Sequence, residues 1–202
     1  MHLPRIDVLL ASMVGLVFFS KVDRRKRYHQ VMVFEDHIYK TTFKAHIGTY
    51  ECPGLPFGQT NSGKTFQRVV DFLFIKHLNV NIFAYQDDIL IATPTLELHY
   101  EVLEHVFSQL DKYNLKANLG KCQFFMDQIN FLGFIITREE ILPDANRMSP
   151  ILNFPQPTSV SQILSFLGML TFYRGHLVQF SKVAKLLYQL LKKDVPFSWG
   201  SA

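Results

Sequence analysis

Short apolar runs and longer amphipathic segments alternate along the chain, and two of the runs meet at a pair of aspartates. Residues 82–84 and 89–91, which contain Ile, Phe and Leu, flank the sequence Tyr85, Gln86, Asp87, Asp88. Runs this short predict two buried strands joined by a tight turn. A further strand-like run, residues 17–23, ends in Asp23.

Longer segments place apolar residues at helical spacing. We expect helices over residues 4–13, 64–78 and 96–113. Weaker strand-like patterns lie at residues 31–34 and 39–45, with Gly48 at the turn of a hairpin, and the Pro- and Gly-rich residues 52–63 predict a loop.

The sequence changes character beyond about residue 142, where four prolines interrupt a short helix and a linker. Ser159 and Gln162 form a capping-box pattern at the start of a helix with an apolar stripe, and a second helix is expected near residues 181–193. Together the patterns predict an α+β fold. Its antiparallel sheet carries the three aspartates, and a small helical segment follows.

Composition narrows the class of protein. The 202 residues are 48% hydrophobic and 19% charged, which is typical of a globular chain. A net charge of +4 permits a polyanionic partner without requiring one. Cys52 and Cys122 form neither a metal-binding spacing nor a disulfide framework. The apolar residues 8–19 are too short to span a bilayer and lack a cleavage site, so we expect an intracellular protein and no membrane partner.

The paired aspartates carry the candidate chemistry. A turn with two aspartates is most often a solvated hairpin tip. Two carboxylates about 4 Å apart repel by about 4 kcal/mol at an effective dielectric near 20, however, and buried strands tolerate this only beside a cation. Oxygen ligands favour Mg²⁺ or Mn²⁺. If the strand that ends in Asp23 lies beside the hairpin, three carboxylates around two ions suit in-line nucleotidyl transfer.

The sequence from Tyr85 to Asp88 resembles the Tyr-x-Asp-Asp box of reverse transcriptases. Its surroundings resemble the reverse transcriptase in the Pol polyprotein of gypsy-type (Ty3-like) long-terminal-repeat retrotransposons. Further matching segments follow in the order of that family: Leu-Pro-Arg-Ile-Asp (3–7), Phe-Ser-Lys-Val-Asp (19–23), Tyr-His-Gln-Val (28–31), Leu-Pro-Phe-Gly (55–58), Thr-Phe-Gln-Arg (65–68), Lys-Cys-Gln-Phe-Phe (121–125), Phe-Leu-Gly (131–133) and Ser-Phe-Leu-Gly (165–168).

The resemblance implies an RNA-directed DNA polymerase. It implies a polymerase palm with a remnant of the fingers over residues 1–140 and a thumb-like helical segment over residues 141–202. The implied partners are an RNA or DNA template with its primer, dNTPs, and the RNase H and integrase of a parent polyprotein. The implied location is a retrotransposon particle in the cytoplasm, or the nucleus.

Residue roles follow from the same resemblance. It implies metal ligation and catalysis by Asp23, Asp87 and Asp88, with Lys121 near the leaving pyrophosphate. The implied nucleotide-binding residues are Tyr28, Gly58, Gln59 and Tyr85, with Tyr28 excluding the ribose 2′-hydroxyl. The implied nucleic-acid contacts are Arg24, Arg25, Gln67, Arg68, Phe131, Leu132 and Gly133. The residues themselves also allow plainer interpretations: a core tyrosine at Tyr28, exposed helix polar residues at Gln67 and Arg68, a surface lysine at Lys121, and a solvated charge run over residues 24–27.

The chain also departs from the family pattern. Lys26 and Arg27 replace a small residue and a glycine, Gln59 replaces a common leucine, and the fingers segment that precedes residue 3 in the family is expected to be largely missing. A catalytically impaired relic, or a nucleic-acid-binding module adapted from one, therefore stays open beside the polymerase. An RNA-dependent RNA polymerase would use the same arrangement of carboxylates on a palm, but Tyr28 and the Tyr-x-Asp-Asp form argue against it.

Overall fold

The computed structural model describes residues 4–24, 27–85, 88–177, 179–192 and 197. Its chain divides into two compact units. The first comprises Met1–Leu132 and Ile136–Ile141, and the second Gly133–Ile135 and Leu142–Ala202. The two units exchange short segments near residues 133–141.

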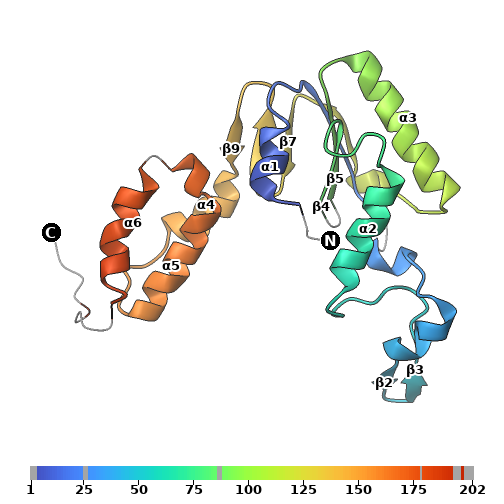
Figure 1. Ribbon diagram of the computed structural model, residues 1–202, viewed down its shortest axis with the longest axis horizontal. Coiled ribbons are helices and arrows are strands. Elements are labelled where there is room, and N and C mark those ends of the chain that lie inside the picture. The colour runs from blue at the N-terminus through green and yellow to red at the C-terminus, as the bar shows by residue number, and fades with distance from the viewer. Residues whose placement is uncertain (1–3, 25–26, 86–87, 178, 193–196, 198–202) are drawn as a thin grey trace. The chain divides into compact units, whose positions relative to one another are not determined.

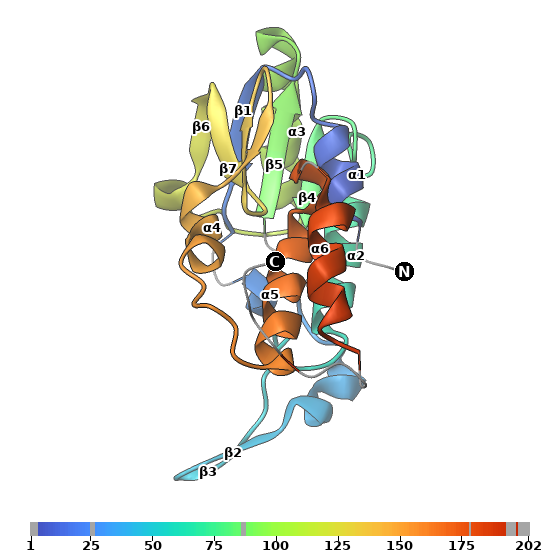
Figure 2. The same cartoon turned by 90° about the vertical axis from the view of Figure 1, so that its left-hand side faces the viewer.

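A four-stranded antiparallel sheet organises the first unit (Figure 2). Its strands, in spatial order, are β4 (Ile82–Tyr85), β5 (Asp88–Thr93), β1 (Phe18–Val22) and β6 (Gln123–Met126). The predicted hairpin and the strand that precedes Asp23 are thus confirmed, and β1 lies directly beside β5. The structure adds β6, for which no strand was predicted.

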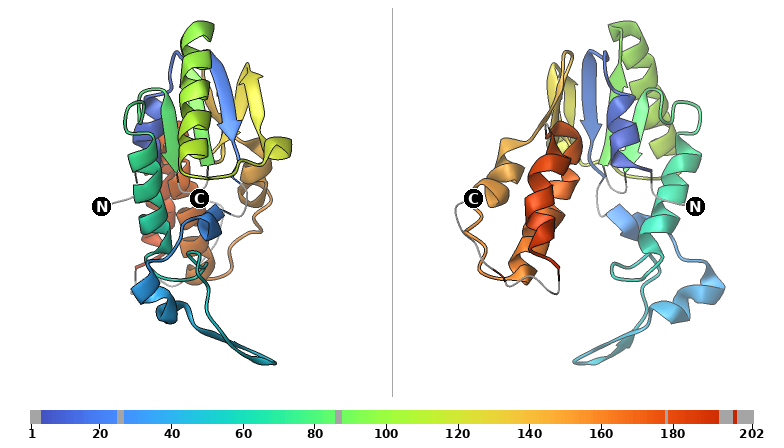
Figure 3. Two further views of the ribbon diagram at one scale, coloured as in Figure 1. Left: turned by 90° about the vertical axis from the view of Figure 1, so that its right-hand side faces the viewer. Right: turned by 60° about the vertical axis from the view of Figure 1, so that its left-hand side comes forward.

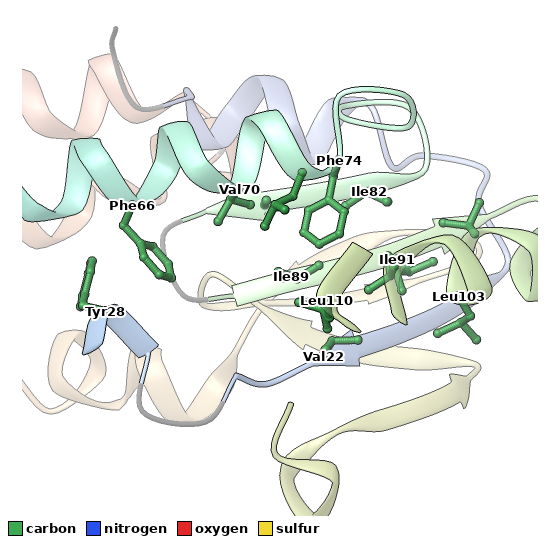
Figure 4. Packing of buried hydrophobic residues seen from close by; sticks show 14 of the residues in the cluster. Val22, Tyr28, Phe66, Val70, Phe74, Ile82, Ile89, Ile91, Leu103 and Leu110 are labelled. Carbon is green, nitrogen blue, oxygen red and sulfur yellow. The ribbon is translucent and has the colours of Figure 1, made fainter. Parts of the chain in front are cut away.

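Helices cover both faces of this sheet. They are α1 (Ile6–Ala11), α2 (Ser62–Leu73) and α3 (Leu96–Lys112), and the two views of Figure 3 show α1 and α3 on opposite faces. Alternate strand residues, including Val22, Ile89 and Ile91, pack with side chains of α2 and α3 in one buried cluster (Figure 4). Because successive strand residues face opposite sides, this cluster fixes which face each neighbouring residue occupies.

One predicted helix ends earlier than the sequence indicates. Helix α2 stops at Leu73, five residues before the predicted end, because the chain must turn back into β4. Asn79, with a φ of 60°, lies in that turn, and the carbonyl of His77 accepts hydrogen bonds from the backbone N–H groups of Asn81 and Ile82. Such left-handed backbone is easiest for glycine and asparagine.

The strands predicted over residues 31–34 and 39–45 were largely wrong. Only β2 (Phe43–Ala45) and β3 (Gly48–Tyr50) form the hairpin, which extends away from the main sheet (Figure 1). Residues Glu35–Thr41 form the 3-10 helix η2 instead. Met32 makes only an isolated bridge to Gly54, since the neighbouring Pro53 has no N–H to extend a ladder.

The second unit contains the helices predicted for the C-terminal segment. A three-stranded sheet in the order β7 (Gln128–Phe131), β8 (Phe134–Thr137) and β9 (Ile141–Pro143) precedes them. The helices are α4 (Ala145–Leu152), α5 (Val160–Phe172) and α6 (Phe180–Gln189), joined by the 3-10 turn η4 (Arg174–His176). Ile163 and Leu167 of α5 pack against Ala184 of α6.

Ser159 caps α5 as predicted, because its Oγ accepts a hydrogen bond from the N–H of Gln162. The side chain of Gln162 accepts from the N–H of Thr158 rather than from Ser159. Among the described residues, no helix has the length and apolar character that crossing a bilayer requires.

A buried histidine links α3 to three strands of the main sheet. His99 is fully buried, with Nε2 2.7 Å from Ser20 Oγ and Nδ1 2.8 Å from Thr93 Oγ1. Thr93 donates its hydroxyl proton to the carbonyl of Thr95, and Ser20 Oγ accepts from the N–H of Phe125. Nδ1 must therefore carry the proton, and Ser20 donates to Nε2. A neutral imidazole satisfies every partner in this network.

Burial lowers the pKa of His99 to about 4. A histidine in an unfolded chain titrates near 6.5, so protons bind preferentially to the unfolded state between these values. The stability that neutral His99 contributes is fully present above about pH 6.5 and is lost as the pH falls toward 4.

We therefore expect the free energy of unfolding to fall by up to about 3 kcal/mol between pH 7 and pH 4 on account of this residue. Urea unfolding at several pH values measures the effect. His99→Gln should flatten the pH dependence, and His46→Gln, at an exposed position, should leave it unchanged. An equal dependence of the free energy of unfolding on pH in wild type and His99→Gln would contradict this role for His99.

Candidate active site

Asp23 and Asp88 lie at the same end of two neighbouring strands. The ladder between β1 and β5 runs from the pair Phe18–Thr93 to the pair Val22–Ile89, and one further step leads to Asp23 and Asp88. Opposed residues of an antiparallel pair direct their side chains to the same face. The side chain of Asp88 is 39% exposed and Asp23 is half-buried, while Asp87 lies outside the described residues.

The segment that contains Lys121 passes beside Asp23. The N–H of Asn118 donates to the carbonyl of Asp23 at 2.8 Å, and the 3-10 turn η3 (Leu119–Lys121) follows at once. The thiol of Cys122 donates to the carbonyl of Asn118, and burial is the main cause that raises its pKa. Lys121 itself is exposed, so its backbone is fixed beside Asp23 while its ammonium is free to reach solvent.

Lys21 joins this group although the sequence interpretation did not select it. Its Nζ lies 2.9 Å from Oδ1 of Asp88. Lys21 and Asp23 are two residues apart on one strand and therefore share a face, which is a signal the sequence already carried. The structure adds the ammonium group of Lys21 to the neighbours of Asp88.

The donor set suits a hard divalent cation. The described carboxylates available at this edge are Asp23 and Asp88, both oxygen donors. Among the described residues no three His, Cys, Asp or Glu side chains gather around a point that could hold a metal, and the third predicted ligand, Asp87, is not described. The contact with the Lys21 ammonium shows that Asp88 accepts a positive charge at this position.

Tyr28 and the loop that contains Gly58 come together near α2. Tyr28 lies on the 3-10 helix η1 (Arg27–Gln30) and is 9% exposed. Its ring centroid lies 5.0 Å from that of Phe57 and 4.6 Å from that of Phe66. Gly58 has a φ of 87°, which favours glycine, and no atom lies within 4 Å of the position a Cβ would take. Tyr28 therefore packs with core aromatic rings and exposes only a small part of its surface.

The other two predicted nucleotide-binding residues are more accessible. Gln59 is exposed, with its Nε2 3.5 Å from the carbonyl of Lys40. Tyr85 is half-buried and is the last residue of β4, where it pairs with Asp88. The structure therefore places Tyr85 directly beside Asp88, whereas Gln59 lies on the loop near Lys40.

The predicted nucleic-acid contacts divide by burial. Arg24 is 4% exposed, and its guanidinium carbon lies 4.1 Å from the centroid of the Phe66 ring. Gln67 is 3% exposed and donates to the carbonyl of Ala84 at 3.2 Å. Arg24 packs inside the protein against Phe66, and Gln67 braces α2 against β4. Gln67 is therefore not the exposed polar residue that one interpretation expected.

Arg68 is exposed on α2, and Arg25 lies outside the described residues. Phe131, at the end of β7, is 1% exposed. Leu132 and Gly133 have φ values of 52° and 85° and form the two-residue turn between β7 and β8. Paired positive φ values are typical of a tight hairpin.

The profile of the family described as "Reverse transcriptase (RNA-dependent DNA polymerase)" matches residues 4–136. The chain belongs to the reverse transcriptase family. It is 36% identical over 190 residues to the retrovirus-related Pol polyprotein from transposon opus of Drosophila melanogaster, covering 94% of this chain and 19% of that protein. It is 35% identical over 191 residues to the corresponding polyprotein from transposon 297 of the same species, covering 95% of this chain and 18% of that protein. The chain thus spans about a fifth of these relatives.

Solved reverse transcriptases share its fold. A foamy viral protease-reverse transcriptase in complex with RNA/DNA hybrid superposes with a TM-score of 0.82 at 26% identity, covering 99% of this chain and 27% of that chain. The dRH form of the foamy viral enzyme, in complex with ds DNA, superposes with a TM-score of 0.86 at 26% identity, covering 95% of this chain and 33% of that chain. These neighbours confirm the predicted α+β fold of the reverse transcriptase palm.

The bracing role of Gln67 makes a stability prediction. Gln67→Leu removes the donor to Ala84 and should lower the free energy of unfolding by about 1–3 kcal/mol. Arg68→Leu, on the exposed side of the same helix, should change it by less than about 0.5 kcal/mol. Urea denaturation of the two variants measures the difference, and equal losses would show that Gln67 is not a brace.

Proposed function

We propose that this reverse transcriptase domain catalyses RNA-directed DNA synthesis, transferring a nucleotide from a dNTP to the 3′-hydroxyl of a primer. The observation that carries the proposal is the β1–β5 register, whose last pair, Val22–Ile89, lies next to Asp23 and Asp88 at one end of the two central strands. The Tyr-x-Asp-Asp hairpin supplies Asp88 from a segment distant in sequence from Asp23. Membership of the family makes this edge the natural place for the chemistry.

Asp23 and Asp88, with Asp87 from the same hairpin, would hold two Mg²⁺ or Mn²⁺ ions. When bound, such ions activate the attacking oxygen and neutralise the leaving pyrophosphate. The contact of Asp88 with an ammonium group supports this ligand role, because it shows a carboxylate oriented toward positive charge. Lys121, exposed and anchored beside Asp23, would donate a proton to the leaving phosphate oxygen.

The nucleotide would lie near Tyr28. Phe57 and Phe66 hold the Tyr28 ring in place, so a sugar packed against it has no room for a 2′-hydroxyl. Gly58 leaves space for the close approach of a base, and Gln59 and Tyr85 complete the proposed contacts. Fixed aromatic packing supports steric selection, since a mobile ring could yield to the larger sugar.

The template and primer would contact exposed basic residues of the domain. We assign phosphate contacts to Arg68 and Arg25 and a primer contact to the turn at Leu132 and Gly133, with Phe131 supporting that turn from the interior. Arg24 we assign to the fold, because it packs against Phe66. The net charge of +4 permits a polyanionic partner. The partners we propose are an RNA or DNA template with its primer, together with the RNase H and integrase of a Pol polyprotein inside the cell.

Primer extension on an RNA template with dNTPs and Mg²⁺ or Mn²⁺ tests the proposal. Asp88→Asn should lower incorporation at least about 100-fold, because charge stabilisation by a single well-placed group commonly contributes that much. Glu104→Gln, which removes a carboxylate on the exposed face of α3, should leave incorporation unchanged. Asp23→Asn and Asp87→Asn should match Asp88→Asn.

Equal incorporation by wild type and the aspartate variants would end the catalytic proposal. Salt-sensitive binding of RNA or DNA that survives loss of all three aspartates, without incorporation by any variant, would instead indicate a nucleic-acid-binding module.

Sugar selection provides a separate test. Tyr28→Val should raise the use of rNTPs relative to dNTPs by about 5- to 150-fold, the range expected when overpacking of about 1–3 kcal/mol is relieved. Tyr28→Phe keeps the ring and should retain the preference for dNTPs. Competition between dNTPs and rNTPs measures both ratios, and a wild-type preference for rNTPs would favour an RNA polymerase.

A further inference from the structure

An ion pair between Lys21 of β1 and Asp88 of β5 lies at the strand ends that form the proposed active site. Its Nζ–Oδ1 distance is 2.9 Å, and the two side chains are 23% and 39% exposed. Asp88 is one of the proposed metal ligands, so a protein cation already contacts a carboxylate that the reaction needs for a divalent ion.

The strand register explains why Lys21 reaches Asp88. Lys21 lies opposite Leu90 of β5 on one side and Gln123 of β6 on the other. Asp88 is two residues from Leu90 and is therefore the diagonal neighbour of Lys21 on the same face. Because Leu90 is fully buried, the ammonium must extend along the strands toward solvent, which leads it to the carboxylate.

Partial burial separates this pair from an ordinary surface contact. Ion pairs between freely exposed side chains are screened by water and contribute little. The backbones of Lys21 and Asp88 are held by adjacent strands of one ladder, and less than a quarter of the Lys21 side chain is exposed. The ammonium is thus held near the carboxylate and competes with any other cation for it.

We propose that Lys21 is a positioning residue that occupies the cation position on Asp88 until a divalent ion displaces it. The inference rests on the proposed function. The carboxylates of Asp23 and Asp88 with no counter-ion would repel one another, and the ammonium relieves part of this repulsion in the metal-free protein. The same charge weakens metal binding in the absence of nucleotide, so that nucleotide phosphates must supply further ligands before the site fills.

Direct titration with Mn²⁺, without nucleotide or nucleic acid, tests the proposal by calorimetry or by electron paramagnetic resonance of the free ion. Lys21→Met keeps the length of the side chain and removes its charge. It should bind Mn²⁺ at least about fivefold more tightly than wild type, the lower range of coupling between competing ligands. Lys21→Arg should resemble wild type, as should Lys44→Met, which removes an exposed lysine on β2.

The gain in Mn²⁺ affinity should disappear when Lys21→Met is combined with Asp88→Asn. Thermal unfolding of each metal-free variant checks that it is folded, and Lys21→Gln replaces Lys21→Met if the latter is not. Equal Mn²⁺ affinity for wild type and the neutral variant, with binding still dependent on Asp88, would overturn the role of Lys21 and leave the proposed function standing. Mn²⁺ binding that is unchanged by loss of Asp88 in every variant would overturn both the role of Lys21 and the proposed function.

Discussion

The antiparallel pairing of β1 with β5 is the constraint on which the rest of the structure depends. Val22 lies opposite Ile89, and both side chains are buried under α2 and α3. A slip of one residue would exchange the residues on the two covered faces of the sheet and point Asp88 into the core. The hydrophobic effect therefore sets the register. Burial of the strand residues therefore brings Asp23 and Asp88 to the same end of the two strands, and the two carboxylates need no attraction of their own.

Polar contacts hold this register at both ends. At one end, the imidazole of His99 bonds Ser20 and Thr93, and Ser20 in turn accepts from β6. At the other, Asn118 donates to the carbonyl of Asp23 and fixes the segment that leads to Lys121. The Lys21–Asp88 pair lies between strands that are already fixed. The aspartate edge is thus built on a rigid support, as chemistry that depends on carboxylate position requires.

The elements that the sequence predicts well are those whose pattern reflects burial. The apolar runs beside Asp87 and Asp88 predicted β4 and β5, and the helical spacing of residues 96–113 predicted α3 to within one residue. Strand β6 was missed because its residues are mostly exposed. The roles of Arg24 and Gln67 were not predictable, since each depends on a partner on another element, Phe66 and Ala84. Lys21 could have been found from its two-residue spacing to Asp23, but only with the strand pairing assumed.

The central claim is that Asp23 and Asp88 share one face of the sheet and one cation position. Anomalous diffraction from crystals of this chain soaked in Mn²⁺ and a dNTP measures it most directly. The account predicts a manganese peak within coordination distance of carboxylate oxygens from both residues, with Lys21 moved away from Asp88. Carboxylates that face opposite sides of the sheet, or manganese bound elsewhere while Lys21 stays on Asp88, would contradict it.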